Sequence, residues 1–136
     1  MSKLDLNPYL FFDGECKTAM EFYKSIFGGK LESMPYEKLP DAEVLPEQKG
    51  RLIHASLSGG EIDLMASDIT GPIGKGNISL SLSGTDEPKL RHMFKELSAG
   101  GKVNHPLEPA FWGVIHGNLT DKFGIDWMFT IGKEQA

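Results

Sequence analysis

Gly28-Gly29-Lys30 closes an amphipathic stretch with helical spacing, and the same tripeptide returns as Gly100-Gly101-Lys102 at the end of a second such stretch. Each helical stretch follows a short apolar run, and each tripeptide precedes segments with the pattern of strands. A unit repeated within one chain usually gains stability by pairing with its twin. The repeat therefore predicts a duplicated fold in which each copy has a strand, a helix, a Gly-Gly break and further strands.

Composition places this chain of 136 residues in the size range of one globular domain. The formal net charge is -5, and no cluster of Lys and Arg provides the basic surface that nucleic acid or an anionic membrane would need. The single cysteine excludes an internal disulfide, and we expect neither a signal peptide nor a membrane span. The sequence therefore predicts a cytoplasmic protein with no nucleic-acid or membrane partner.

The first copy is expected over residues 7–68. Residues 9–12 predict a strand and residues 16–27 a helix, which Gly28-Gly29 ends. Residues 31–36 have an extended pattern. Pro35, Pro40 and Pro46 then mark a long polar connection, which is poor material for a helix or strand. Residues 52–58 and 62–67 predict two strands joined by a turn, and each strand has one apolar and one largely polar side.

The second copy is expected over residues 77–132, after a linker at residues 67–76. Residues 78–83 alternate as a strand, and Thr85-Asp86-Glu87-Pro88 has the residue types that begin a helix. A turn around His105-Pro106 is expected next, followed by strands at residues 114–119 and 125–131. The predicted fold class is therefore α+β, a single domain of two βαβββ units whose mixed sheets curl around a cleft.

Several segments, taken in order and with their spacing, resemble a known family. They are Tyr9-Leu10-Phe11-Phe12-Asp13-Gly14, residues 19–27, His54-Ala55, Leu64-Met65-Ala66-Ser67-Asp68, Trp112-Gly113, and residues 120–128 around Asp121-Lys122-Phe123-Gly124. The chain resembles the PhnB-like branch of the vicinal oxygen chelate superfamily, which includes glyoxalase I, extradiol dioxygenases, fosfomycin resistance transferases and bleomycin-binding proteins. The resemblance implies paired βαβββ units and a homodimer without fixing one reaction. Pairing of the units within one chain and pairing between two chains are both compatible with it.

The resemblance also implies where a metal would bind, because enzymes of this superfamily use His and Glu side chains on the first and fourth strands of each unit. The corresponding positions here are Asn7, Asp63, Asn77 and Met128, of which only Asp63 is a usual ligand. We therefore expect no glyoxalase-type metal site. If a divalent metal is bound, the candidate ligands are His54, Asp63 and His116, since two His and a carboxylate compose a facial triad. The alternative is that both histidines are neutral and bind no metal.

A small polar or aromatic molecule is the expected ligand, because the predicted cleft is partly polar. The residues predicted to line it are His54, Ser56, Asp63, Ser67, Asn77, Ser79, Trp112 and His116. The candidates for an aromatic wall are Tyr9, Phe11, Phe111 and Trp112, with core or dimer packing as the alternative role. No catalytic residue is assigned.

Two other motifs are interpreted structurally. Cys16 opens a helix, where a thiol is easily activated, but its place in the apolar stripe predicts a buried core thiol. Asp121-Lys122-Phe123-Gly124 predicts a hairpin turn. No Gly-rich turn follows a first parallel strand, so neither S-adenosylmethionine nor another cofactor is expected.

The predicted function is therefore small-molecule binding by a protein of the PhnB-like branch. Two alternatives stay open, a metal-dependent lyase, transferase or dioxygenase, and an antibiotic-sequestering resistance protein.

Overall fold

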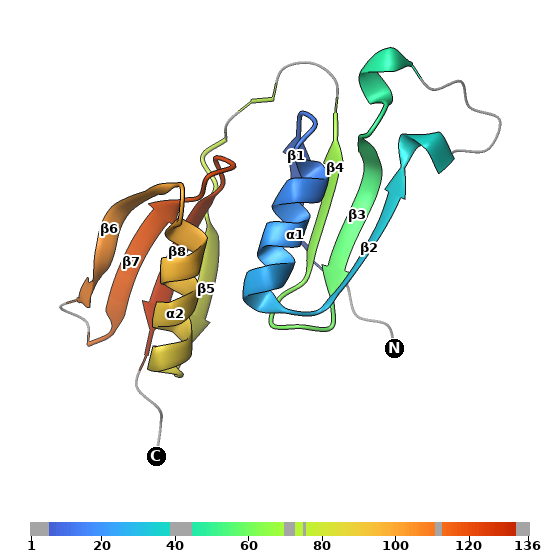
Figure 1. Ribbon diagram of the computed structural model, residues 1–136. Coiled ribbons are helices and arrows are strands. Elements are labelled where there is room, and N and C mark those ends of the chain that lie inside the picture. The colour runs from blue at the N-terminus through green and yellow to red at the C-terminus, as the bar shows by residue number, and fades with distance from the viewer. Residues whose placement is uncertain (1–5, 39–44, 70–72, 75, 111–112, 133–136) are drawn as a thin grey trace. The chain divides into compact units, whose positions relative to one another are not determined.

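The computed structural model describes residues 6–38, 45–69, 73–74, 76–110 and 113–132 (Figure 1). The chain forms two compact units, Met1–Lys75 and Gly76–Ala136. Each unit has one four-stranded mixed sheet and one α-helix, which confirms the α+β class with two βαβββ repeats. Neither helix of the described residues has the length and apolar character needed to cross a membrane.

The first unit contains β1 (Tyr9–Phe12), α1 (Cys16–Phe27), β2 (Lys30–Pro35), β3 (Leu52–Ser58) and β4 (Leu64–Asp68). The strand order is β1-β4-β3-β2, with β1 parallel to β4 and the other neighbours antiparallel. Two 3-10 helices, η1 (Tyr36–Lys38) and η2 (Pro46–Gln48), lie in the connection that the sequence predicted to be irregular. Short segments of this kind need only local hydrogen bonds, which is why the prolines permit them.

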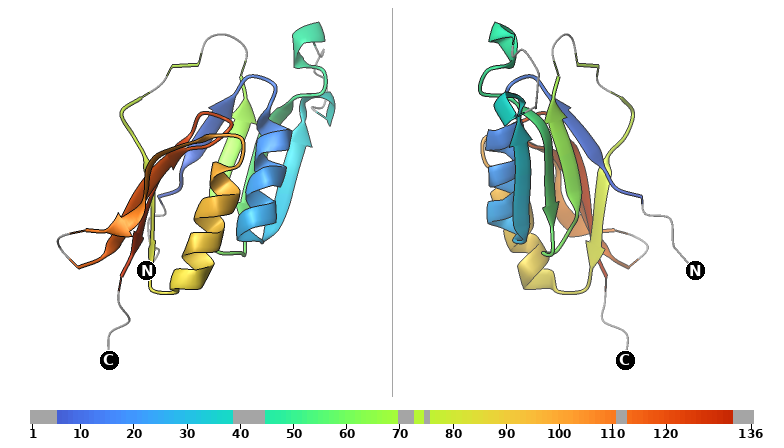
Figure 2. Two further views of the ribbon diagram at one scale, coloured as in Figure 1. Left: turned by 60° about the vertical axis from the view of Figure 1, so that its left-hand side comes forward. Right: turned by 90° about the vertical axis from the view of Figure 1, so that its right-hand side faces the viewer.

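Helix α1 covers one face of the first sheet (Figure 2). Its buried side chains have the predicted helical spacing and are Cys16, Ala19, Met20, Tyr23 and Phe27. The sheet buries alternate residues of its strands on the same side, among them Leu10, Phe12, Ala55, Leu57, Leu64 and Ala66. The intervening residues of these strands therefore project from the face opposite α1.

The second unit contains β5 (Leu80–Gly84), α2 (Glu87–Ser98), β6 (Lys102–Pro109), β7 (Ile115–Thr120) and β8 (Asp126–Ile131). The strand order β5-β8-β7-β6 repeats that of the first unit. The Asp86 side chain accepts a hydrogen bond from the Lys89 N–H at 3.2 Å and so caps α2, as predicted. The apolar side chains of α2 are also spaced as predicted, and the buried ones are Leu90, Met93, Phe94 and Leu97.

The repeated Gly-Gly has the same physical cause in both units. A Cβ on Gly29 would lie 2.7 Å from the carbonyl oxygen of Ser58, and a Cβ on Gly101 would overlap the carbonyl oxygen of Thr120. Ser58 and Thr120 are equivalent residues, since each aligns with the lysine of its tripeptide. The second glycine is therefore required because the chain passes against the backbone at the end of the third strand of each unit.

Several strand boundaries differ from the sequence prediction. Strand β4 begins at Leu64 and ends at Asp68, so Asp63 lies before the strand, and Asp68 belongs to the strand although it falls in the predicted linker. The predicted turn at His105-Pro106 is wrong, because both residues lie in β6. Proline is tolerated there because β6 is an edge strand, and its register with β7 shifts on both sides of His105.

Candidate functional site

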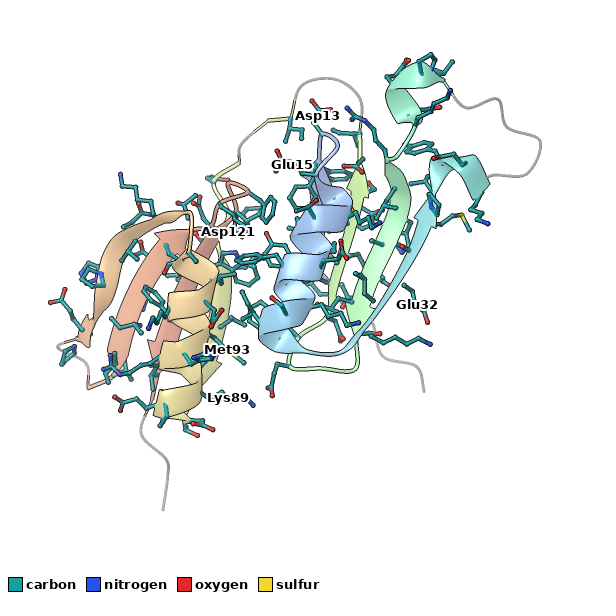
Figure 3. The ribbon with its side chains drawn as sticks, viewed as in Figure 1. Asp13, Glu15, Glu32, Lys89, Met93 and Asp121 are labelled. Atoms are coloured by element: carbon teal, nitrogen blue, oxygen red, sulfur yellow. The ribbon has the colours of Figure 1, made fainter. Side chains whose placement is uncertain are left out.

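The face of the first sheet opposite α1 carries the candidate site. Residues that align across neighbouring strands project from the same side of a sheet, so the strand registers identify its members. We call this surface the His54 face, and its residues are Tyr9, Phe11, Glu32, Met34, His54, Ser56, Met65 and Ser67. Glu32, labelled in Figure 3, comes from β2. The surface therefore draws on all four strands of the unit.

Aromatic and histidine rings meet on the His54 face. The Tyr9 hydroxyl oxygen lies 3.2 Å from Nδ1 of His54, and the centroids of the two rings are 5.9 Å apart. The Tyr9 and Phe11 rings lie 5.2 Å apart, with a tilt of 37° between them. Tyr9, Phe11 and Met34 are 41%, 48% and 46% exposed, which is high for large apolar side chains in a sheet that has a buried opposite face. The surface offers ring faces beside an imidazole.

The second unit presents a different surface at equivalent positions, which we call the His116 face. His116 corresponds to His54, because the two histidines occupy the same position along the third strand when the strand registers of the two units are matched. Its Nδ1 lies 3.3 Å from the Thr130 hydroxyl oxygen. Ser81 aligns with Met128 as Tyr9 aligns with Met65, so a serine stands where the first unit has its tyrosine. The His116 face is therefore polar where the His54 face is aromatic.

The predicted lining residues are distributed as follows. The structure brings His54, Ser56 and Ser67 together on the His54 face, while His116 belongs to the second unit. Asp63, Asn77 and Ser79 are exposed and precede β4 or β5 instead of standing within a strand. Trp112 and Phe111 lie outside the described residues.

Sequence reasoning did not predict the contact between Tyr9 and His54 or the exposure of Met34. The available signal was the alternation in residues 9–12, where Leu10 and Phe12 are buried, whereas the aromatic residues Tyr9 and Phe11 are exposed.

The three proposed metal ligands do not converge. Ser56 in β3 aligns with Met65 in β4, and the two strands run antiparallel. His54 comes before Ser56 and Asp63 comes before Met65 in the chain, so His54 and Asp63 lie on opposite sides of this aligned pair. They are separated by four residue positions along the strands, or about 13 Å, which is too far for two side chains to hold one ion. No group of three His, Cys, Asp or Glu side chains within the described ranges is arranged to bind a metal.

The ligand positions implied by the family also fit a glyoxalase-type metal poorly. Continued beyond the strand ends, the parallel registers align Asn7 with Asp63 and Ser79 with Asp126. Asn77 and Met128 do not align with each other, because β5 begins at Leu80 and Met128 aligns with Ser81. The resulting donors are carboxylate, amide and hydroxyl oxygens, which suit hard cations and not zinc or nickel centres built with imidazole.

Cys16 has the properties of a core thiol, as predicted. Its side chain is fully buried, and burial, together with the nearby Asp68 carboxylate, raises the pKa of the thiol from 9.0 to about 12. A thiol that stays protonated at neutral pH is a poor nucleophile. We therefore exclude Cys16 from the candidate site.

The raised pKa of Cys16 predicts a loss of stability in alkali. Above pH 9.0 the unfolded thiol releases its proton while the folded thiol keeps it until about pH 12. The free energy of unfolding should therefore fall by about 1.4 kcal/mol per pH unit in this window. Urea unfolding at about pH 8 and about pH 10 measures the change. The Cys16→Ala variant is the control, and an equal decrease in that variant would assign the effect to other groups.

The Asp121-Lys122-Phe123-Gly124 motif forms the turn between β7 and β8, as predicted, and Asp121 is labelled in Figure 3. The buried Asp121 carboxylate accepts hydrogen bonds from the N–H groups of Phe123 and Ile125 at 2.8 and 3.1 Å. It also accepts one from the indole Nε1 of Trp127 at 2.9 Å. The most specific motif of the sequence therefore holds a turn against the core.

The fold agrees with the comparisons to known proteins. The family model described as the Glyoxalase/Bleomycin resistance protein/Dioxygenase superfamily matches residues 5–129, and the chain belongs to this superfamily. Its relatives include protein YjdN of Escherichia coli strain K12, which is 31% identical over 97% of this chain and 98% of YjdN.

Two solved structures extend this relationship. Protein PA1353 from Pseudomonas aeruginosa is 35% identical, with a TM-score of 0.85 over 97% of this chain and 100% of that chain. The PhnB protein from Bacillus cereus is 24% identical and shares the fold, with a TM-score of 0.73 over 95% of this chain and 100% of that chain. The resemblance to the PhnB-like branch is thereby confirmed.

Proposed function

We propose that the protein binds a small planar organic molecule on the His54 face and does so without a glyoxalase-type metal. The observation that carries the proposal is the cluster of Tyr9, Phe11 and His54, whose rings lie within 6 Å of a neighbour and are not packed into the core. Ring faces provide apolar area and stacking, and each aromatic pair is worth about 0.5–1.5 kcal/mol beyond simple burial. Small-molecule sites typically combine such surfaces with a few polar groups.

The neutral polar groups on the His54 face are few and lie next to the rings. Ser67 aligns with Phe11 and is 6% exposed, and Ser56 aligns with Met65 beside it. Together with the imidazole of His54 they provide hydrogen-bonding groups for one polar edge of a ligand. A planar molecule with one polar edge therefore matches this surface, because its ring can stack on Tyr9 or Phe11 while its polar edge meets the hydrogen-bonding groups.

We propose no metal, because the chain does not provide suitable donor atoms for a glyoxalase-type metal ion. The positions implied by the family hold oxygen donors, and His54 is about 13 Å from Asp63 by their register. A homodimer, a cytoplasmic location and a cleft shared by the two units remain predictions. No feature of the described residues favours the metal-dependent enzyme or the antibiotic-sequestering protein over simple binding.

The proposal is tested with acetophenone as the probe and cyclohexyl methyl ketone as the control ligand that lacks the aromatic ring. We expect acetophenone to bind more tightly, and we expect Phe11→Ala to weaken its binding about tenfold, because a stacking surface is lost. NMR titration of the labelled protein measures both affinities.

Val103→Ala is the matched control variant for this titration, because Val103 is 41% exposed on β6 of the second unit. Equal affinity for the two ketones, or equal weakening by Phe11→Ala and Val103→Ala, contradicts the proposed site.

A further inference from the structure

The bond between Tyr9 and His54 decides which nitrogen of the imidazole carries the proton. The Tyr9 hydroxyl oxygen lies 3.2 Å from Nδ1 of His54, and it is the hydrogen-bond partner of the ring within the described part of the chain. A phenol is a good donor, and the unprotonated nitrogen of a neutral imidazole is a good acceptor. The stable arrangement therefore has the Tyr9 hydroxyl donating to Nδ1, which places the imidazole proton on Nε2.

We infer that Tyr9 is a positioning residue that holds neutral His54 as its Nε2–H tautomer, so that the His54 face selects ligands with an acceptor oxygen. The choice of ligand rests on the proposed function, whereas the choice of tautomer rests on the geometry of Tyr9 and His54. An Nε2–H group donates to a carbonyl or carboxylate oxygen and repels a ligand N–H or O–H hydrogen. The ligand class is thereby narrowed to planar aromatic compounds that carry a carbonyl or carboxylate group.

The second unit provides an internal comparison. His116 has Nδ1 3.3 Å from the Thr130 hydroxyl, an aliphatic alcohol in place of a phenol. Thr130 aligns directly with His116 in the sheet, whereas Tyr9 reaches His54 from β1 across the intervening strand β4. The long reach of the tyrosine ring brings an aromatic face and the hydrogen bond to the same point. Within the described residues, the His54 face thus combines the Tyr9–His54 hydrogen bond with a stacking surface.

The tautomer is measured directly by long-range proton–nitrogen correlation NMR of the histidine rings, with the His54 signals assigned by their loss in His54→Gln. We expect the Nε2–H form to dominate in the natural protein. In Tyr9→Phe, which keeps the ring and loses the hydroxyl, we expect the ratio of the Nδ1–H to the Nε2–H form to rise about fivefold, as for the loss of one ordinary hydrogen bond. The control Phe11→Leu should leave this ratio unchanged. An unchanged ratio in Tyr9→Phe overturns the inference whatever the ligand results are.

The ligand preference is measured with two probes that share a ring, acetophenone as an acceptor and aniline as a donor. We expect acetophenone to bind at least about tenfold more tightly, and we expect His54→Gln, whose amide N–H can replace Nε2–H, to keep more of this preference than His54→Leu. Preference for aniline overturns the inference. Failure of both probes to bind contradicts the proposed function, and the tautomer measurement then still decides the role of Tyr9.

Discussion

The Asp68→Ala variant is expected to lose about 4 kcal/mol of the free energy of unfolding, because three N–H groups, two of them in buried hydrogen bonds, would lose their acceptor. The Asp68 side chain accepts hydrogen bonds from the N–H groups of Gly14 and Cys16 through Oδ1, at 2.8 and 3.0 Å. Its Oδ2 accepts one from the N–H of Leu52 at 2.9 Å. One carboxylate on β4 thereby joins the start of α1 to the start of β3.

The size of this effect follows from the way that α1 begins. Its N-cap residue Glu15 makes no side-chain capping bond, so Asp68 serves in its place from 52 positions along the chain. Asp68→Asn should cost less, about 2 kcal/mol, because its amide keeps one acceptor oxygen but places an N–H group against a second donor.

Urea unfolding measures the Asp68 variants, with Asp13→Ala as the matched control. Asp13 is also an aspartate at the start of α1, but it is half exposed and forms an ion pair with Arg51 at 2.6 Å. Such a pair contributes about 0–1 kcal/mol. A loss in Asp68→Ala that is within about 1 kcal/mol of the loss in Asp13→Ala would refute the proposed role of Asp68.

The Gly29→Ala variant is expected to cost about 3 kcal/mol, through two effects that add. Gly29 has φ of +103°, a conformation that residues with a Cβ rarely adopt, and the new Cβ would lie 2.7 Å from the Ser58 carbonyl oxygen and 2.9 Å from the Gly60 nitrogen. Both neighbours are backbone atoms, so no side chain can turn aside to make room.

Gly28→Ala separates the two effects in the same tripeptide. Gly28 has φ of +72°, and its added Cβ meets nothing within 4 Å. Since its ψ of -172° places it in a region that is almost exclusive to glycine, the variant should cost only this backbone strain, about 1–2 kcal/mol. Thermal and urea unfolding compare the variants, and a larger loss for Gly28→Ala than for Gly29→Ala would contradict this account of the repeated motif.

Much of the fold follows from local patterns that the sequence displays. The apolar faces of α1 and α2 depend on residues that are close in the chain, and so do the Gly-Gly breaks. Both features lie where the spacing of the sequence predicts them. The boundaries of β4, β5 and β6 depend on the pairing partners, which local patterns do not specify. Pro106 illustrates the limit, because only its place on an edge strand allows it to continue β6.

The candidate site was predictable only in part, for the same reason. Alternation in residues 52–58 placed His54 and Ser56 on one face of the sheet, and the structure has them there. The position of Asp63 relative to His54 depends on the β3–β4 register, and the contact of Tyr9 with His54 depends on β1 being the neighbour of β4. Asp68 lies in a segment that carries the family resemblance, but its three hydrogen bonds could not be predicted, since the partners come from two distant segments.

Binding of a planar organic molecule on the His54 face can be tested by titrating isotope-labelled protein with acetophenone. We expect the largest chemical-shift changes at Tyr9, Phe11, His54 and Ser67, which share this face. Changes confined to other segments, or no change up to the solubility limit of acetophenone, would contradict it.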